Sequence, residues 1–398
     1  MKKILLSTIF ALASATMFAQ TIYICKGGNY TKADITEGLE ISLTEGIDSI
    51  TFQEPQFEKV VTIAYNGTSA TVTIPSSVGG VTCSSGTSSD VVLASTNTTD
   101  EITYKVSGTS SDGSLTIKGD YKMTVQLDGV SLTSAKGAAL DIQCGKRINL
   151  IMADGSENTF VDAANGGQKA CLYTKGHLEL SGAGTLNVTG NTNHAIASKE
   201  YFQVKKSVKA INIVKAANDA IHVGQYFQMN GGELNITSTT ANDGVQVEYK
   251  TDDNGNIIAD EENSGKVVIK GGTLNITMAA NQDSKGIKTE GDIVISGGTF
   301  NINANSNGSR GMQADGNMVI GEEDNSTNIL IYATGTKCTV ADDKGDPHNC
   351  MGIKIDGDLT VNAGTISVYN TGSKSKGIKV GGKYTKNGGT VNAAVEQK

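Results

Sequence analysis

The stretch GIKTEGDIVISGGTFNIN, residues 286–303, holds the pattern that decides the fold. Apolar residues alternate with polar ones in three short runs, as in half-buried β-strands. Each run has one inward-facing pair: Ile287 with Thr289, Ile293 with Ile295, and Phe300 with Ile302. The pair Gly297-Gly298 separates the second and third runs, where a sharp turn requires a positive φ. Three short strands with inward-facing pairs predict one triangular coil of chain.

The same pattern returns along most of the chain. A small residue followed by an aliphatic anchor marks each return, at Leu140, Leu172, Ile196, Ile221, Val245, Ile287, Met312, Ile353 and Ile378. Most anchors are 24 or 25 residues apart, and the longer spacings fit one coil plus an insertion. A constant period is the signature of stacked repeats. The chain is therefore expected to be all-β and to form a right-handed, single-stranded parallel β-helix.

Three parts can be distinguished along the chain. Residues 1–20 have the features of an export signal peptide, because Lys2 and Lys3 precede an apolar run and then small residues. Residues 21–55 do not fit the repeat and predict a small β cap over the open end of the stack. Residues 56–398 are expected to form the β-helix. No later apolar run is long enough for a membrane span, so we expect a protein of the periplasm or cell surface.

The composition restricts the partners. The chain has 48 Gly, three Pro and no Trp, which suits a narrow core of Ile, Val and Leu better than one large core. Without Lys2 and Lys3 the formal net charge changes from −8 to −10. An acidic surface argues against nucleic acid and anionic membranes, and it suits calcium or neutral sugars. We expect a monomer.

Six cysteines in an exported chain favour disulfides over metal thiolates. Cys338 and Cys350 bracket a polar loop and are the first candidate pair. The pairs Cys144–Cys171 and Cys25–Cys83 follow. Free buried thiols are the alternative.

Several segments from about Val60 to the end resemble a family of secreted bacterial parallel β-helical carbohydrate-binding proteins. The segments that carry the resemblance are SGTSSDGSLTIKGDYKMTVQLDGVSLTS (107–134), DGSENTF (154–160), GAGTLNVTG (182–190), NDAIHV (218–223) and NDGVQVE (242–248). The resemblance implies a calcium-binding β-helix that attaches to plant-type polysaccharides without cutting them. It also implies metal sites similar to those of family-nine pectate lyases. Residues 48–52, DSITF, are similar to a segment near the start of many exported proteins of gut-type Gram-negative bacteria.

Acidic and amide residues lie just before the anchors. Residues at equal offsets stack in successive coils about 4.8 Å apart, so their side chains converge at one turn. Such oxygen ligands suit Ca²⁺. The candidate metal ligands are Asn218, Asp219, Asn242, Asp243 and Asp283, together with Glu248, which lies three residues after its anchor. The resemblance carries onto NDAI and NDGV, whereas His194 and Lys285 depart from it, and side-chain-capped turns are the alternative.

A second set of polar residues points outward just after the anchors. Like charges about 4.8 Å apart repel by roughly 3 to 4 kcal/mol at an effective dielectric constant of 20, so either calcium or neighbouring lysines must offset an acidic column. A polar sugar-binding groove is one interpretation, and a solvated face of alternating charge is the other. The candidate ligand-binding residues are Lys288, Glu290, Gln313, Asp315, Lys354 and Asp356, with Tyr201 and Tyr226 as stacking surfaces or as packing between coils.

Two further features are structural. Asn235, Asn275 and Asn301 occupy equal positions between inward aliphatic residues and predict an amide ladder that holds strand register. The insertions 249–264 and 334–349 are acidic and are expected to project from the rod, the first as a hairpin with an Asn-Gly turn.

No catalytic residue is indicated. The four histidines show no nucleophile partner at a readable spacing, and Lys288 near Asp283 is conceivable only as the base of a pectate-lyase mechanism with Ca²⁺. The expected function is therefore non-catalytic binding of plant cell-wall or acidic polysaccharide. A polysaccharide lyase on the same fold and a surface adhesin or structural protein are the alternatives.

Overall fold

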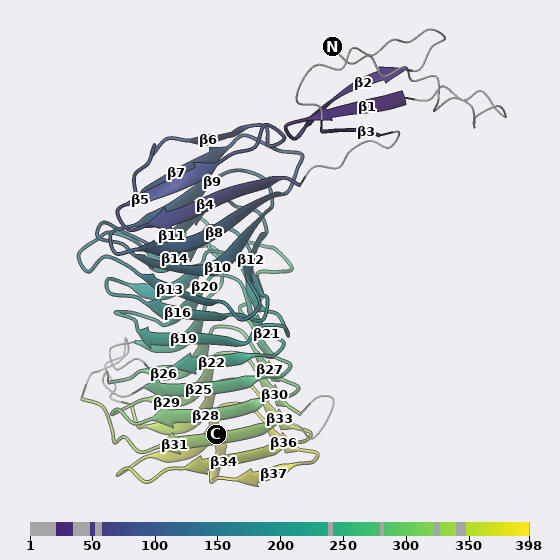
Figure 1. Cartoon of the computed structure of the whole chain (residues 1–398). Coiled ribbons are helices and arrows are strands. Elements are labelled where there is room, and N and C mark those ends of the chain that lie inside the picture. Colours follow the sequence, from purple (N-terminus) through teal and green to yellow (C-terminus); the bar gives the residue numbers. More distant parts are fainter. Residues whose placement is uncertain are drawn as a thin grey trace, which may run out of the picture.

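The structure is a computed structural model that describes residues 21–34, 48–51, 58–237, 242–278, 282–321, 327–339 and 348–397. Over these residues the chain is all-β, and parallel strands stack as coils along one long axis (Figure 1). The predicted signal peptide and Phe52 lie outside the described residues. Among the residues described, none form a helix of the length and apolar character that a membrane crossing requires.

One face of the stack is a 13-stranded sheet, which we call the anchor sheet because it carries the predicted anchors. Its neighbouring strands follow the chain from coil to coil. In chain order they are β6 (Val81–Cys83), β7 (Asp90–Ser95), β9 (Ser114–Lys118), β11 (Leu140–Gln143), β14 (Ala170–Thr174), β17 (His194–Ser198), β20 (Ile221–Val223), β23 (Asp243–Val247), β26 (Lys285–Thr289), β29 (Arg310–Ala314), β32 (Met351–Ile355), β35 (Lys376–Val380) and β38 (Val395–Gln397).

Two further faces complete each coil. The second face contains β12 (Ile148–Met152), β15 (Leu178–Ser181), β18 (Phe202–Val204), β21 (Phe227–Met229), β24 (Val267–Ile269), β27 (Ile293–Ile295), β30 (Met318–Ile320), β33 (Leu359–Val361) and β36 (Tyr384–Lys386). The third contains β13 (Glu157–Val161), β16 (Thr185–Thr189), β19 (Ala210–Lys215), β22 (Glu233–Ile236), β25 (Thr273–Met278), β28 (Thr299–Ala304), β31 (Asn328–Ala333), β34 (Thr365–Tyr369) and β37 (Thr390–Asn392).

The long strand β10 (Met123–Thr133) joins the second and third faces, because it pairs with both β12 and β13. Before it come β4 (Val60–Asn66), β5 (Ser69–Thr73) and β8 (Ile102–Ser110), and β4 pairs in parallel with β8 but antiparallel with β5. These first coils are therefore less regular than those that follow.

A small antiparallel sheet precedes the coils. Its strands are β1 (Thr21–Lys26), β2 (Asn29–Asp34) and β3 (Ser49–Thr51), in the order β2-β1-β3. It touches the first coils through Asn29, whose side chain donates a hydrogen bond to Ser76. Residues 35–47 and 52–57 lie outside the described part, so an end cap over residues 21–55 stays a prediction.

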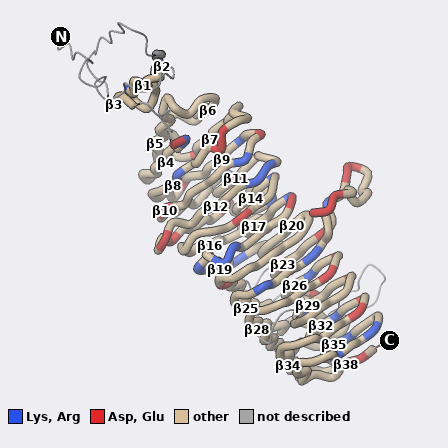
Figure 2. Tube along the Cα trace, turned by 90° about the vertical axis from the view of Figure 1, so that its right-hand side faces the viewer, with Lys and Arg blue, Asp and Glu red and all other residues tan. Residues whose placement is uncertain are grey.

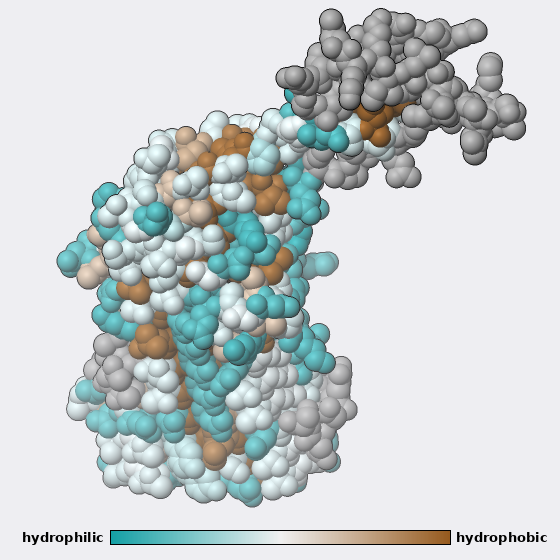
Figure 3. All heavy atoms as spheres, in the orientation of Figure 1, coloured by the Kyte–Doolittle hydropathy of each residue, from teal (hydrophilic) through white to brown (hydrophobic). Residues whose placement is uncertain are grey.

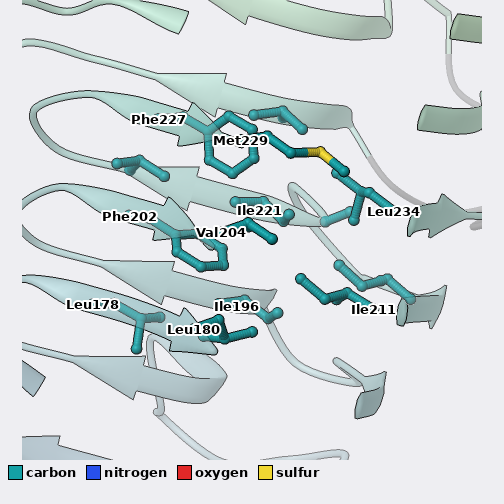
Figure 4. Packing of buried hydrophobic residues seen from close by; sticks show 14 of the residues in the cluster. Leu178, Leu180, Ile196, Phe202, Val204, Ile211, Ile221, Phe227, Met229 and Leu234 are labelled. Atoms are coloured by element: carbon teal, nitrogen blue, oxygen red, sulfur yellow. The ribbon is translucent and has the colours of Figure 1, made fainter. Parts of the chain in front are cut away.

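The predicted stacking register is confirmed. Each anchor is paired with the next, from Leu140 with Leu172 through to Ile353 with Ile378. All nine anchors are buried in one continuous core, and Figure 4 shows part of it with the anchors Ile196 and Ile221. The same column continues beyond the predicted repeat to Leu115 at one end and Val395 at the other. Parallel stacking is thus established, while the right-handed winding stays a prediction.

The residue before each anchor is small because it faces the core directly beside the anchor. A Cβ added at Gly286 would meet the Ile302 side chain at 2.8 Å, so this position faces the core beside its anchor, Ile287. Two core-facing residues in a row reverse the alternation of the strand. The residue two positions before each anchor therefore lies on the outer side, together with the residue one position after it.

Glycine and asparagine form the other columns that the sequence predicts. Glycine pairs separate the second and third strands of several coils, and the second glycine of the pair has a positive φ at Gly232, Gly272, Gly298 and Gly389. The predicted amide ladder of Asn235, Asn275 and Asn301 is confirmed, because each side-chain amide donates to the oxygen of the one before it at 2.8 Å. It extends back through Asn212 to Asn187.

The predicted disulfides are wrong, because no disulfide joins the six cysteines. Two backbone hydrogen bonds, from Cys338 to His348 and from Cys350 to Thr336, place these cysteines opposite other residues across a short antiparallel pair. The thiol of Cys350 donates to the carbonyl oxygen of Ala304 at 3.4 Å. The alternative prediction, free buried thiols, holds for five of the six cysteines, and the sixth, Cys83, is half-buried.

The exterior differs from this core. In the view of Figure 3 most of the surface of the coils is neutral to hydrophilic, and a hydrophilic band runs along the stack. Polar exteriors on a narrow aliphatic core agree with the composition, which is poor in large aromatic residues.

The inward assignment can be tested on one strand with two substitutions. Ile293 is buried in the core, whereas its neighbour Val294 is half-buried on the outer side of β27. Ile293→Asp places an unpaired charge in the core and should destabilise the protein by several kcal/mol. Val294→Asp should cost much less. Thermal melting of both variants checks this, and equal melting temperatures would contradict the assignment.

Candidate functional site

The outer side of the anchor sheet is a long polar strip. The residue one position after each anchor lies in register with its neighbours from coil to coil. The members of this strip are Thr116, Asp141, Tyr173, Ala197, His222, Gln246, Lys288, Gln313, Lys354 and Lys379. Figure 2 looks onto this sheet and shows basic and acidic positions alternating along it.

A pocket of about 550 Å³ lies at the N-terminal end of the strip. Strands β7, β9, β11 and β14 form its floor, and the loops before β11 and β14 form its walls. Its polar and aromatic lining residues are Asp90, Ser114, Thr116, Lys136, Asp141, Gln143, Gln168, Lys169 and Tyr173. The sequence prediction placed ligand-binding residues further along the strip and missed this end. Asp141 and Tyr173 each directly follow an anchor, so the same position in the repeat indicates them from the sequence.

Hydrogen bonds hold the polar groups of the pocket in place. Asp90 accepts from Lys136 at 2.5 Å and from the Ser114 hydroxyl at 2.9 Å. Asp141 accepts from the side-chain amide of Gln143 at 2.6 Å. Burial raises the pKa of Asp141, although the hydrogen bond from Gln143 and nearby lysines oppose that rise. The pocket thus offers both donors and acceptors.

An apolar patch lies beside these groups. Tyr173 packs with Ala170 and Ala197 in a small cluster outside the main core. The Nζ of Lys169 lies 5.5 Å from the centre of the Tyr173 ring, within the range of a cation–π contact. The pocket therefore combines carboxylates, amines and amides with one aromatic side chain that is largely buried, because Tyr173 is 8% exposed.

A column of buried ionisable residues runs next to the strip, two positions before the anchors. Its members are His194, Asp219, Asp243, Lys285 and Arg310, all at most 8% exposed. The Asp219 carboxylate accepts from the Asp243 backbone N–H at 3.2 Å, and Asp243 accepts from that of Lys285 at 2.7 Å. Each aspartate thus caps the next coil.

Two histidines surround the carboxylate of Asp219. Its Oδ2 lies 3.2 Å from Nδ1 of His194 and 3.1 Å from Nδ1 of His222. Burial alone would raise the pKa of Asp219, but the hydrogen bonds with both histidines outweigh it and bring the pKa to about 2. Burial alone would lower the pKa of His222, but the hydrogen bond and charge of Asp219 outweigh burial and raise this pKa.

The environment of Asp243 is different. Its Oδ2 is buried without a hydrogen-bond partner in the described part of the chain, 3.9 Å from the Nζ of Lys288. Burial raises the pKa of Asp243 to about 6, with Lys285 opposing the rise and Asp219 adding to it. The structure therefore brings Asp219, Asp243 and Lys288 to one region.

Of the other predicted metal ligands, Glu248 lies 3.8 Å from Nε2 of His222, whereas the remaining three have other surroundings. Asp283 is bound by Arg310 at 2.9 Å and by Lys285 at 3.1 Å. The amide of Asn218 donates to Asn193 at 3.2 Å, and Asn242 is exposed. Ca²⁺ takes six to eight oxygen ligands, whereas these carboxylates have imidazole, ammonium and guanidinium groups as neighbours. The described residues at these turns do not fit a calcium ion, and calcium binding by the chain stays a prediction.

The outward-facing acids after the anchors, Glu290, Asp315 and Asp356, each have a polar partner, which is a counter-charge only at Asp356. Lys354 pairs with Asp356 at 2.9 Å, and Gln313 donates to Asp315 at 3.4 Å. Glu290 accepts from the backbone N–H of Tyr249 at 2.7 Å. This is the geometry of a solvated face of alternating charge, and binding of a ligand there stays a prediction.

Tyr201 and Tyr226 stack on each other, with ring centres 4.8 Å apart. The other neighbour of Tyr201 is the His177 ring, stacked at 4.1 Å, and Tyr201 is 7% exposed. Tyr201 therefore packs between coils, which was the alternative to a stacking surface for a sugar.

The first insertion is tied to this stack. It contains the predicted turn, with Gly255 at φ 82°. Glu200 accepts from Lys250 at 2.6 Å and lies 2.8 Å from His177, which also contacts Glu262 of the insertion at 3.2 Å. In the second insertion, residues 340–347 lie outside the described part.

Stacked parallel coils with an elongated polar face define the chain as an all-β repeat protein. The chain belongs to the carbohydrate-binding domain-containing protein family, whose model matches residues 89–398. A carbohydrate-binding domain-containing protein of Acetivibrio thermocellus is 28% identical over 111 residues, which are 25% of this chain and 39% of that protein. The match thus spans less than half of the relative.

A solved structure is also similar. It is a polysaccharide lyase-like protein from C. thermocellum, determined as a gadolinium derivative, with a TM-score of 0.51 and 22% identity. The similarity covers 66% of this chain and 97% of that one. At this identity the similarity shows the fold alone.

The ion pairs of Glu200 predict a dependence of stability on pH. Burial alone would raise the pKa of Glu200, but His177 and Lys250 outweigh it and lower the pKa. A lowered carboxyl pKa gives stability that is present above the unfolded pKa, near 4.3, and is lost as the pH falls through the folded pKa. Glu200→Gln should therefore lower the melting temperature at pH 6 by about 2 °C or more and flatten its fall below pH 5. The exposed Glu157→Gln is the control, and identical pH profiles for all three proteins would contradict the prediction.

Proposed function

We propose that this chain binds polysaccharide along the outer side of the anchor sheet without cutting it, with the pocket beside Tyr173 as the main subsite. The observation that carries the proposal is the mixed lining of that pocket. Two carboxylates, two lysines and two amides surround an aromatic side chain. Sugar hydroxyls both donate and accept hydrogen bonds, so such a lining suits them.

The lysines favour an acidic glycan. Lys169 is exposed beside Tyr173, and Lys136 lines the same pocket from the neighbouring loop. A uronic acid would give each ammonium group a carboxylate to pair with. The strip continues through Lys288, Gln313 and Lys354, which could contact further sugar units of the same polymer.

The site gives a lyase less support. Lyase chemistry of the pectate type needs a base, and Lys288 is the candidate because Asp243 is 3.9 Å away. That lysine lies several coils from the pocket, and the chain belongs to a family named for binding. We therefore favour binding over cleavage.

The proposal includes the setting of the protein. We infer that the chain is exported from a Gram-negative cell, works as a monomer in the periplasm or at the surface, and winds right-handed. Crossover connections between parallel strands are right-handed in about 98% of cases, which supports the last point.

Binding of soluble polygalacturonate tests the proposal. Lys136→Ala with Lys169→Ala should weaken binding by about tenfold, or 1.4 kcal/mol, because two ammonium groups at the pocket are lost. Lys288→Ala with Lys354→Ala should weaken binding of the polymer more than that of a short oligomer. Isothermal titration measures each affinity.

Matched controls make the result specific. Lys206→Ala with Lys209→Ala removes the same charge from exposed positions before β19 and should leave affinity unchanged. The exposed pair Tyr332 and Tyr369, stacked at 5.3 Å on the third face, offers another aromatic surface. Loss of binding only in a Tyr332→Ala, Tyr369→Ala variant would move the site to that face. Absorbance from unsaturated uronides would establish a lyase, and no binding to any glycan would favour a structural protein.

A further inference from the structure

Two imidazoles and one carboxylate meet at the edge of the anchor sheet. His194, Asp219 and His222 each offer one ligand atom, and these atoms lie within 4.8 Å of one another. They come from successive coils, with His194 at the start of β17, Asp219 just before β20 and His222 within it. The stacking register places His194 beside Asp219 of the next coil, and His222 follows Asp219 by three residues.

The separations suit a small metal ion. Zn²⁺ is bound by imidazole nitrogen and carboxylate oxygen at about 2.0–2.2 Å, so neighbouring ligand atoms of a tetrahedral site lie about 3.3 Å apart. The Oδ2 of Asp219 is 3.2 Å from Nδ1 of His194 and 3.1 Å from Nδ1 of His222. The two rings are stacked at 4.3 Å, so both Nδ1 atoms approach the same oxygen.

The Nδ1 atoms can be unprotonated, as a metal requires. The backbone N–H of Asp219 lies 3.3 Å from Nδ1 of His194, a contact that uses the lone pair of that nitrogen. On the far side of His222, Nε2 lies 3.8 Å from Oε2 of Glu248. Nδ1 of His222 lies closer to a carboxylate, 3.1 Å from Oδ2 of Asp219, so a metal ion bound at Nδ1 would displace the proton of that hydrogen bond and leave the ring protonated at Nε2, on the side of Glu248.

The surroundings favour a cation and leave one side open. Asp243, the next member of the buried column, has an Oδ2 without a hydrogen-bond partner among the described residues. Side-chain exposure is 3% for Asp219 and 10% for His194 but 27% for His222. Three ligands are therefore held by packing, while the side of His222 faces the polar strip.

The ligand set separates this site from a calcium site. Imidazole suits Zn²⁺ and similar borderline ions, whereas Ca²⁺ takes oxygen ligands. We propose that His194, Asp219 and His222 bind one divalent transition-metal ion of the Zn²⁺ type, with its remaining position open toward the polar strip. This inference does not depend on the glycan.

Titration of the chelator-treated full-length chain with Zn²⁺, in the absence of glycan, tests the inference. One equivalent should bind and raise the melting temperature, because the ion binds only the folded form. In an imidazole-resolved NMR spectrum, that equivalent should shift the signals of His194 and His222 and leave those of His177 unchanged. Equimolar Ca²⁺ should not prevent these changes.

Substitutions complete the test. His222→Gln should weaken Zn²⁺ binding by at least about tenfold, and its partly exposed position allows the variant to fold. His177→Gln is the matched control, because His177 also contacts two carboxylates but no second histidine lies in its group. Absence of Zn²⁺ binding, equal binding by His222→Gln, or displacement of Zn²⁺ by equimolar Ca²⁺ would overturn the inference.

Discussion

Hydrogen bonding of each coil to the next in one parallel register is the constraint on which the structure depends. It places residues at equal offsets about 4.8 Å apart, so every side chain is surrounded by the same position of two other coils. Like residues then form columns, such as the amide ladder from Asn187 to Asn301 and the packed rings of Phe202 and Phe227. A charged column requires counter-charges close by, which explains why acids and lysines alternate on the anchor sheet.

Departures from the regular coil create the candidate sites. The pocket lies where the chain between Leu140 and Leu172 is longer than one coil, and the extra loop carrying Gln168 and Lys169 rises beside the sheet. Two core-facing residues in succession turn the position two residues before the anchor outward, which joins Asp219 to His222 three residues later. Both sites thus follow from local exceptions to the repeat, and both open onto the same polar strip.

Histidine and lysine residues at the turns before the anchors distinguish this chain from the calcium-binding family that its sequence resembles. His194 and Lys285 stand in the column where the resemblance implies oxygen ligands, and the structure puts each next to an aspartate. A nitrogen ligand lowers the preference for calcium, and an ammonium group neutralises the carboxylate that calcium would bind. Family membership therefore supports carbohydrate binding more directly than it supports the metal.

The sequence by itself determined the parallel stacking, the core anchors and the amide ladder, because these follow from a period that every coil repeats. It could not determine the disulfides, since Cys338 and Cys350 are close in sequence but stand opposite other residues. The pocket depends on how loops of unequal length pack over the sheet. The group of His194, Asp219 and His222 joins one coil to the next, and only the tertiary structure decides its distances, because rotamers and the turn before each anchor determine where the ligand atoms meet.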